Sequence, residues 1–352
     1  MLLFSVESSC DETSVAVVEM SETVRAIRAC KTSSQIDIHK LYGGVVPEIA
    51  SRAHAEVISS LAYEALAEAG VTMADIDAVA VTAYPGLIGA LLVGVNFAKG
   101  VAASYHKPLI PVNHICGHIA ANYLAFPALR PPFLALTISG GHTSLIDVRG
   151  YTDFHLIGRT RDDAAGEAFD KVARVMGIPY PGGAEMDRLA SCGNPHAIHF
   201  PSAAIAGDTL DLSFSGLKTA VINYLHTAEQ RAARPAAAQP DGDCTLAYSA
   251  PDVAASFTYA VTESLTQRAR EAVEQTGARQ LVLAGGVAAN SHLRNALGAY
   301  AEKAGISLYL PPLSLCGDNA AMIGAQGYFE YLAGHLAGSD LNASATCELR
   351  HH

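Results

Sequence analysis

LLFSVESSCDETSVAVV, at residues 2–18, places two short apolar runs around one polar turn. The runs Leu2–Val6 and Ser14–Val18 are rich in β-branched residues, and the turn Glu7–Thr13 between them carries Asp11 and Glu12. Two such runs around a polar turn are typical of a β-hairpin. Asp11 and Glu12 are then either ordinary turn residues or a base and a hydrogen-bond acceptor that face a ligand.

The same pattern returns in the second half of the chain. Phe133–Ile138 is an apolar run that ends in the turn Ser139–Thr143, and the run Ser144–Val148 follows it. Leu281–Ala284 is a further apolar run, which leads through two glycines into a helix near Asn290. Alternating strands and helices favour an α/β fold in layers, and the repetition indicates two related lobes that join near residues 126–132.

Length and composition exclude several classes of protein. A chain of 352 residues, 50% hydrophobic and 16% charged, predicts about two globular domains and excludes a disordered chain. The 23 Lys and Arg against 34 Asp and Glu give a net charge of −11, so a polyanionic partner must be held locally. The seven cysteines contain no CxxC pair, which is typical of reduced thiols. We expect a cytoplasmic protein.

Residues 78–98 carry no charged side chain and are long enough to span a membrane. The Pro85-Gly86 pair interrupts this stretch and predicts a strand, a turn and a helix instead. Glu7 and Asp11 lie near the N-terminus without a basic segment before them, which is not the pattern of a signal peptide. We expect no membrane contact.

Two histidines are candidates for metal binding. His114 and His118 are four residues apart in a segment that suits a helix, so both imidazoles project from one face. They either share a metal ion or are only surface neighbours. Asp318 is a candidate oxygen ligand, although spacing alone does not bring it to the histidines. Ile115 stands where an HExxH protease needs its glutamate, which disfavours a peptidase.

Three glycine pairs indicate a nucleotide site. Gly140-Gly141, Gly182-Gly183 and Gly285-Gly286 each lie near a hydroxyl, acid or amide, and glycine lets backbone N–H groups approach phosphate. The P-loop and Rossmann motifs are absent from the sequence, so the site must have another design. Asp170 is a candidate for binding ribose hydroxyls.

Ten motifs follow one another between about residue 3 and residue 330. They are Glu7–Thr13, Tyr42–Glu48, Pro85–Gly94, Asn113–His118, Ser139–Thr143, Asp162–Lys171, Tyr180–Gly183, Ser213–Lys218, Gly285–Asn290 and Asp318–Asn319. Together they resemble the TsaD family, the Gcp/YgjD group of bacterial relatives of the KEOPS catalytic subunit. Two positions depart from the family pattern, because Tyr84 stands where glycine is frequent and Gly317 where threonine is frequent.

The resemblance implies an ASKHA fold (actin, sugar kinase and Hsp70), with nucleotide and metal in a cleft between two lobes. The first lobe would span residues 1–130 and be completed by a helix at about 318–337. The second would span 131–317. The Ala- and Pro-rich composition of residues 228–243 indicates an insertion in the second lobe, and we expect a loosely ordered tail at 338–352. The implied activity is tRNA N6-adenosine threonylcarbamoyltransferase, which moves the threonylcarbamoyl group of threonylcarbamoyl-AMP to the adenosine beside the anticodon in ANN-reading tRNAs.

The resemblance also implies roles for individual residues. His114, His118 and Asp318 would bind one divalent ion, Fe²⁺ or Zn²⁺, and Glu12 or Asp11 would orient the amine and accept its proton. The contacts to the donor, or to ATP, ADP or AMP in its place, would be Thr137, Ile138, Ser139, Gly140, Gly141, Asp170, Gly183, Asp187 and Asn290.

The implied partners, besides tRNA, are a TsaB-like paralogue, a TsaE-like ATPase and a TsaC/Sua-type synthase that makes the donor; a homo-oligomer is also compatible. The helix expected at Arg52–Ala69, or an element beside it, is the candidate surface for the paralogue. A basic stretch, Arg25, Arg28, Lys31, Lys40 and Arg52, is the candidate contact for RNA. The alternative functions are a small-molecule kinase or ATPase of the same fold, a metal-dependent glycoprotease and a non-catalytic scaffold.

Overall fold

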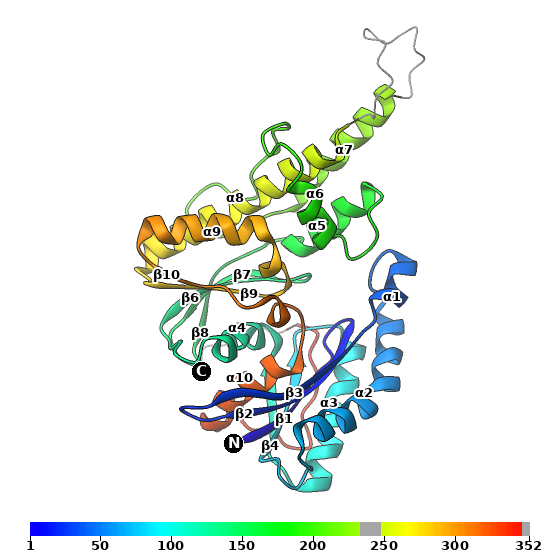
Figure 1. The fold of residues 1–352 in the computed structure, drawn as a ribbon, viewed down its shortest axis with the longest axis vertical. Helices are drawn as coiled ribbons and strands as arrows, with labels where there is room; N and C mark the ends of the chain where they lie inside the picture. Colours follow the sequence, from blue (N-terminus) through cyan, green and yellow to red (C-terminus); the bar gives the residue numbers. More distant parts are fainter. Residues whose placement is uncertain (233–247, 347–352) are drawn as a thin grey trace.

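The chain forms two five-stranded sheets (Figure 1). The structure is a computed structural model, and it describes residues 1–232 and 248–346. The first sheet has the order β3-β2-β1-β4-β5 and consists of β1 (Leu2–Glu7), β2 (Glu12–Met20), β3 (Arg25–Ser34), β4 (Ala78–Tyr84) and β5 (Leu109–Asn113). The second has the order β10-β9-β6-β7-β8 and consists of β6 (Phe133–Ile138), β7 (Thr143–Val148), β8 (Phe154–Arg159), β9 (Gln280–Ala284) and β10 (Ser307–Tyr309).

The two sheets have the same topology. β1 pairs antiparallel with β2, and β2 with β3, whereas β4 and β5 continue the sheet in parallel. β6, β7, β8, β9 and β10 repeat this scheme in the same sequence order. Antiparallel neighbours can be joined by tight turns, whereas parallel neighbours need a crossover segment. The predicted α/β fold of two related lobes is therefore confirmed.

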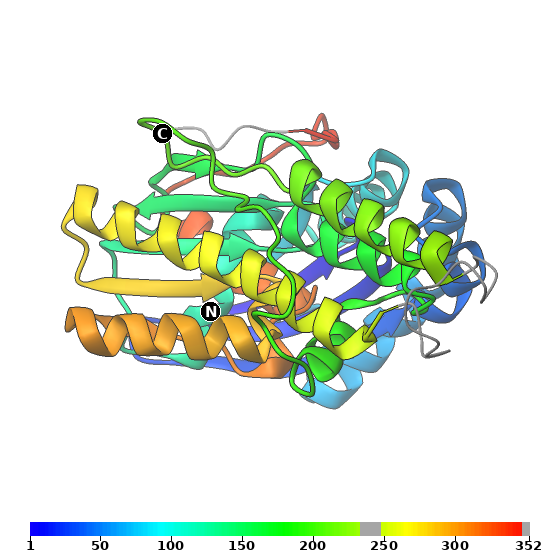
Figure 2. The same ribbon diagram turned by 90° about the horizontal axis from the view of Figure 1, so that it is seen from above.

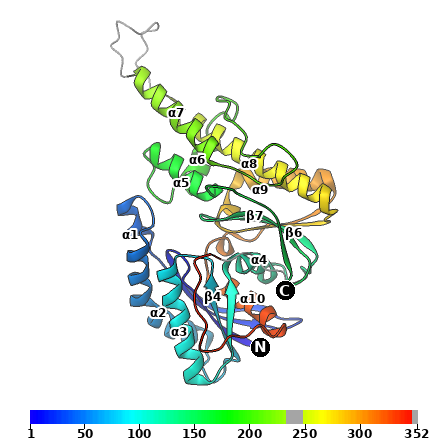
Figure 3. The same cartoon turned by 180° about the vertical axis from the view of Figure 1, so that it is seen from behind.

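The helices form three layers around the two sheets (Figures 1 and 3). The first sheet is covered on its outer face by α2 (Pro47–Ala69) and α3 (Ile88–Tyr105), with the short α1 (Ile36–His39) and η1 (Lys40–Tyr42) before α2. The central layer, between the sheets, contains α4 (His114–Ala125) and α10 (Ala320–Leu332), with η4 (Leu313–Leu315) beside α4. The outer face of the second sheet carries α5 (Ala165–Val175), α6 (Gly183–Ala190), α7 (Ser215–Ala232), α8 (Ala250–Thr276), η3 (Gly286–Ala289) and α9 (Ser291–Ala304) (Figure 2).

Both faces of each sheet are buried, as the continuous apolar runs predict. On β1, Leu3 faces the central layer, and Phe4 faces α2 and α3. The central apolar cluster joins residues of both sheets to α4 and α10. α10 approaches the first sheet closely because Gly324 and Gly327 face it. A Cβ at Gly324 would stand 2.5 Å from Val18 on β2 and 2.9 Å from Ser5 on β1, and a Cβ at Gly327 would stand 2.7 Å from Ala80 on β4. This packing fixes where α10 begins.

Three helix predictions can be compared with the structure. The helix expected at residues 113–124 is α4, and Asn113 is its N-cap, whose Oδ1 accepts the Ile115 N–H at 2.8 Å. The helix expected at Arg52–Ala69 begins earlier, because Pro47 suits a first helical turn. The stretch 78–98 forms β4, a turn and the start of α3, as predicted. Within the described residues, α3 has the length and mean hydropathy of a membrane span, and it packs against α2 and β4.

Two segments expected to be irregular are described only in part. The expected insertion at 228–243 begins as helix, since α7 continues to Ala232, and residues 233–243 lie outside the described part. The expected loose tail at 338–352 is described to Thr346 and contains no helix or strand there. It is nevertheless anchored, because the Ser344 N–H donates to the Ala83 carbonyl at 3.0 Å and the Gly86 N–H to the Ala345 carbonyl at 3.2 Å.

Candidate active site at the N-termini of the two central helices

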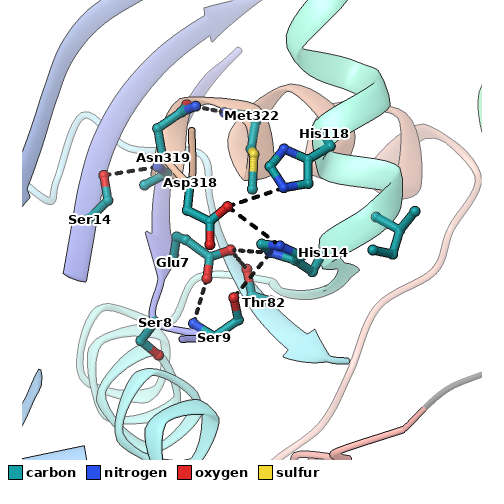
Figure 4. Close-up of polar contacts among 12 residues, drawn as sticks. Glu7, Ser8, Ser9, Ser14, Thr82, His114, His118, Asp318, Asn319 and Met322 are labelled. Atoms are coloured by element: carbon teal, nitrogen blue, oxygen red, sulfur yellow. Dashed lines mark hydrogen bonds and ion pairs between the residues drawn. The ribbon is translucent and has the colours of Figure 1, made fainter. Parts of the chain in front are cut away.

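The N-termini of α4 and α10 bring three distant side chains together. His114 is the first residue of α4, and Asp318 comes just before the N-cap of α10, Asn319. The Ala320 N–H donates to Ser14 Oγ at 2.9 Å, which ties the start of α10 to β2. Asp318 Oδ1 then lies 3.1 Å from His118 Nε2 and 3.6 Å from His114 Nε2 (Figure 4).

This arrangement fits a divalent metal ion. The three ligand atoms all lie within 4.8 Å of one another. Ligands bound at about 2.1 Å around a tetrahedral ion stand about 3.4 Å apart, which matches the two measured separations. Both ring nitrogens of His118 are buried without a hydrogen-bond partner among the described residues, although His118 Nε2 faces a carboxylate. A shared cation would satisfy His118 Nε2 and the carboxylate together.

The electrostatics of the site also favour a cation. Burial opposes the charge on His114, but Asp318 and Glu7 outweigh it and raise the pKa of His114 to about 9. Burial would raise the pKa of Asp318, but the charge of His114 and the close contact with His118 Nε2 hold it well below its usual range. His114 therefore attracts a proton strongly in the metal-free protein, and a divalent ion can take the place of that proton.

The polar turn of the first hairpin is held from both lobes. His54, on α2, bonds through Nε2 to the Cys10 carbonyl at 2.9 Å and through Nδ1 to Thr13 Oγ1 at 2.7 Å. From the second lobe, the Tyr180 hydroxyl donates to Asp11 Oδ2 at 3.1 Å. The expected turn is shorter than predicted, because Glu7 ends β1 and Glu12 begins β2. Asp11 and Glu12 thus stand in a fixed loop at the junction of the lobes.

Asp11 and Glu12 form a pair that holds a proton. Burial, followed by the negative charges of Asp318 and Asp11, raises the pKa of Glu12 to about 10. A hydrogen bond with Asp11 adds to this effect. In the metal-free protein Glu12 is therefore neutral at pH 7. A cation held by Asp318 would offset the negative charge of Asp318 and so reduce its effect on the pKa of Glu12.

The raised pKa of Glu12 predicts a pH-dependent gain of stability in the Glu12→Gln variant. The pKa of a glutamate in an unfolded chain is about 4.3, so the folded protein binds the additional proton between that pH and about pH 10. The free energy of unfolding of the wild type therefore falls as the pH rises through this range. In urea titrations of metal-free protein, we expect the stability advantage of Glu12→Gln over the wild type to grow by up to about 1.4 kcal/mol per pH unit above pH 4.3, so that it is severalfold larger at pH 8 than at pH 5.

The control for this experiment is Glu56→Gln, which changes an exposed carboxylate on α2. We expect this variant to be as stable as the wild type at both pH values. A gain in Glu12→Gln of the same size at pH 5 and pH 8 would show that Glu12 is not held protonated by its surroundings.

The second lobe contributes the turns that were expected to bind nucleotide. The turn after β6 packs closely against two glycines, Gly166 of α5 and Gly285 after β9. A Cβ at Gly166 would collide with the backbone of Ser139, and a Cβ at Gly285 with the backbone of Ile138. Gly140 and Gly141 themselves are exposed, and a Cβ at either one would meet nothing within 4 Å. The backbone of this turn is therefore open to a ligand. Thr137 Oγ1, on β6, is buried and has no hydrogen-bond partner among the described residues.

Three other predicted nucleotide contacts have structural partners within the second lobe. Asp170 Oδ1 accepts the Gly182 N–H at 2.8 Å and so fixes the turn before Gly183, the first residue of α6. Asp187 Oδ1 accepts the N–H and the hydroxyl of Ser291 at 3.0 and 3.1 Å. Asn290 is the N-cap of α9. These bonds leave some of the polar atoms of Asp170, Asp187 and Asn290 for a ligand.

Sequence reasoning missed Glu7, His54 and Tyr180 as residues of this site. The sequence pattern predicts Glu7 in the hairpin turn, whereas in the structure it is the last residue of β1 and is fully buried. A glutamate directly after an apolar run is the signal that could have identified it. His54 and Tyr180 reach the hairpin turn from α2 and from the second lobe, and this contact has no local signal in the sequence.

Comparison with known proteins identifies the family. The model of the TsaD family, described as tRNA N6-adenosine threonylcarbamoyltransferase, matches residues 26–325. The chain belongs to the TsaD family. A Clostridium perfringens protein named tRNA N6-adenosine threonylcarbamoyltransferase is 51% identical over 99% of this chain and 98% of its own length. A protein of the same name from Moorella thermoacetica is 52% identical over 97% of this chain and 95% of its own length.

Solved structures support the ASKHA fold of this TsaD-family chain. The crystal structure of T. kodakarensis HypF matches with a TM-score of 0.62 and 14% identity over 97% of this chain and 49% of HypF. Component A of the Acidaminococcus fermentans (R)-2-hydroxyglutaryl-CoA dehydratase matches with a TM-score of 0.52 and 16% identity over 94% of this chain and 97% of its own. Identities this low show the fold alone, and that fold is the two-lobed one predicted from the sequence.

Proposed function

We propose that this TsaD-family protein transfers the threonylcarbamoyl group of threonylcarbamoyl-AMP to the N6 amine of the adenosine beside the anticodon in ANN-reading tRNAs. A bond forms between N6 and the carbamoyl carbon, the bond between that carbon and the phosphate oxygen breaks, and AMP leaves. The observation that carries this proposal, beyond family membership, is the convergence of His114, His118 and Asp318 beside the Asp11–Glu12 pair.

His114, His118 and Asp318 would hold one divalent ion, and two imidazoles with one carboxylate suit Fe²⁺ or Zn²⁺. When bound, such an ion supplies a Lewis acid that polarises a carbonyl or phosphoryl oxygen of the donor. The N–H groups of Gly140 and Gly141 would bind the donor phosphate, because their turn is open to a ligand. The family resemblance implies further donor contacts from individual residues of the second lobe, namely Thr137, Ile138, Ser139, Asp170, Gly183, Asp187 and Asn290. ATP, ADP or AMP would occupy the donor site in place of the donor.

The adenine amine is a weak nucleophile and must lose a proton as the new bond forms. We assign Asp11 as the proton acceptor of the pair, because the Tyr180 hydroxyl donates to its Oδ2 and holds the side chain at the junction of the lobes. Glu12, with its raised pKa, is neutral and would orient the amine through a hydrogen bond. Asp11 thus takes the N6 proton, and AMP departs as the anion.

The RNA must be held by more than this chain. Of the basic stretch proposed from the sequence, Arg28 pairs with Glu19, Lys31 with Glu68 and Arg52 with Glu48. Arg25 lies over the rings of Tyr123, Tyr151 and Phe329 instead of projecting freely. Little free positive charge is left there for phosphate contacts, so partner proteins would supply the remaining RNA affinity. A TsaE-like ATPase and a TsaC/Sua-type donor synthase complete the system, in the cytoplasm.

The outer face of α2 and α3 is the proposed contact for a TsaB-like paralogue. Tyr63 on α2 is 77% exposed, and Ile88 and Leu92 on α3 are 47% and 36% exposed. Large exposed apolar side chains on a pair of packed helices are typical of an interface. We expect Tyr63→Lys to weaken binding of the paralogue by at least about tenfold in isothermal titration calorimetry.

The matched control is Tyr259→Lys, which changes a tyrosine on α8 of the second lobe that is 42% exposed. We expect it to bind the paralogue like the wild type. Equal loss of binding in both variants, or none in Tyr63→Lys, would place the paralogue on another surface.

Reconstitution tests the proposed function. The purified chain is combined with the donor synthase, the paralogue, the ATPase and unmodified ANN-reading tRNA, and the nucleosides are separated by liquid chromatography and mass spectrometry. We expect threonylcarbamoyladenosine to form only when this chain is present. Phosphorylation of a small molecule without any modified adenosine would favour the kinase alternative.

A further inference from the structure

Glu7 is a completely buried carboxylate that the proposed transfer step does not use. It stands at the end of β1, beside His114, the first residue of α4 (Figure 4). Its Oε2 lies 3.1 Å from His114 Nδ1 and 2.6 Å from Thr82 Oγ1, and its Oε1 lies 2.5 Å from the Ser9 backbone nitrogen. Such a group is costly to bury unless each of its contacts is a hydrogen bond.

The contacts of Glu7 determine which nitrogen of His114 carries a proton. Glu7 Oε1 accepts the Ser9 backbone N–H, and Glu7 Oε2 accepts the Thr82 hydroxyl, so both oxygens of the carboxylate are hydrogen-bond acceptors. A carboxylate that accepts at both oxygens leaves His114 Nδ1 as the donor of the contact between them. The Ser9 hydroxyl, also 3.1 Å from Nδ1, can donate or accept and does not decide this. When an ion replaces the proton on His114 Nε2, this nitrogen is left to present its lone pair to that ion beside Asp318.

We propose that Glu7 is a positioning residue, which fixes the tautomer and the ring orientation of His114 so that Nε2 is ready to bind the ion. This inference rests on the proposed metal centre. It also distinguishes the two histidines, because His118 Nδ1 is buried without any hydrogen-bond partner in the described part of the chain. His114 is held in advance by Glu7, whereas His118 receives no comparable support through its second nitrogen. A hydrogen-bonded outer carboxylate orients a metal-bound imidazole in this way.

The test is the Glu7→Gln variant in the full chain. An amide keeps the size of the side chain but replaces one accepting oxygen by an NH₂ donor. If the NH₂ group of the glutamine faces His114, Nδ1 must accept, so the ring proton moves to Nε2 and blocks metal binding there. If the NH₂ group faces Ser9 instead, it meets the Ser9 backbone N–H, and two donors oppose each other. We expect the dissociation constant for Zn²⁺, measured by chelator competition on metal-free protein, to rise by about 10- to 100-fold.

Thr82→Val is the matched control, because it removes one hydrogen bond to Glu7 and leaves the carboxylate in place. We expect it to weaken Zn²⁺ binding by less than about threefold, since the main acceptor of the His114 proton remains. Circular dichroism and the thermal midpoint verify that each variant is folded. A folded Glu7→Gln protein that binds Zn²⁺ within about twofold of the wild type would overturn the inference.

A second measurement needs no variant. In the zinc-loaded wild type with ¹⁵N-labelled histidine, long-range ¹⁵N–¹H correlation spectra report the state of each ring nitrogen. We expect His114 to bind zinc through Nε2 and to carry its proton on Nδ1; zinc bound through Nδ1 would contradict the role of Glu7. A wild type that binds no divalent metal overturns both this inference and the proposed metal centre, whereas equal binding in Glu7→Gln overturns this inference alone.

Discussion

His118→Ala is expected to lose the bound metal ion and to form threonylcarbamoyladenosine at least about 10³-fold more slowly than the wild type. His118 supplies one of three ligand atoms, and its Nε2 faces Asp318 Oδ1 at 3.1 Å. Alanine leaves one imidazole and one carboxylate, which do not hold a zinc- or iron-type ion tightly. Metal content is measured by inductively coupled plasma mass spectrometry, and modified nucleoside by the reconstituted assay.

The control is His226→Ala, which changes an exposed histidine on α7 and should leave both the metal content and the rate unchanged. His118→Ala protein that is folded and retains about one ion per chain would place the metal elsewhere. Protein that loses the ion and still modifies tRNA at the wild-type rate would show that the transfer needs no metal.

Asp11→Asn and Glu12→Gln are expected to differ strongly in the chemical step. Asp11 accepts a hydrogen bond from the Tyr180 hydroxyl and is proposed as the base. Replacement of its carboxylate by an amide should therefore lower the single-turnover rate by about 10²- to 10⁴-fold. Glu12 has its pKa raised to about 10 by burial and by Asp318 and Asp11, and glutamine is an isostere of its neutral form. Glu12→Gln should therefore lose less than about tenfold.

Preformed donor and saturating tRNA isolate the chemical step in this comparison. The reverse order, a severe loss in Glu12→Gln and a small one in Asp11→Asn, would make Glu12 the base. Glu12→Ala adds a second control, since it removes the hydrogen bond to the amine as well as the carboxyl group; full transfer by this variant would deny Glu12 any role.

The sequence predicted those features of the fold that depend on local pattern. The two apolar hairpins at residues 2–18 and 133–148 correspond to β1–β2 and β6–β7, and their repetition predicted the two related lobes. The i, i+4 spacing correctly placed His114 and His118 on one helix. Local periodicity determines these features, so they could be read without knowledge of the tertiary structure.

The convergence of the site depends on packing that no local pattern encodes. Asp318 reaches the histidines because α10 lies between the sheets, and Gly324 and Gly327 allow it to approach β1 and β4. The family resemblance predicted this ligand, whereas its spacing in the sequence did not. Composition likewise could not show that the carboxylate of Asp187 is engaged by Ser291, or that the segment near Ser344 is bonded to β4.

The most direct test of the account is the position of the metal in crystals of the zinc-loaded protein, measured by anomalous diffraction on both sides of the zinc absorption edge. We predict one peak per chain, about 2.0–2.2 Å from His114 Nε2, His118 Nε2 and an oxygen of Asp318. A peak at other residues, or no peak in crystals of protein that modifies tRNA, would contradict the proposal that these three side chains form the centre of the active site.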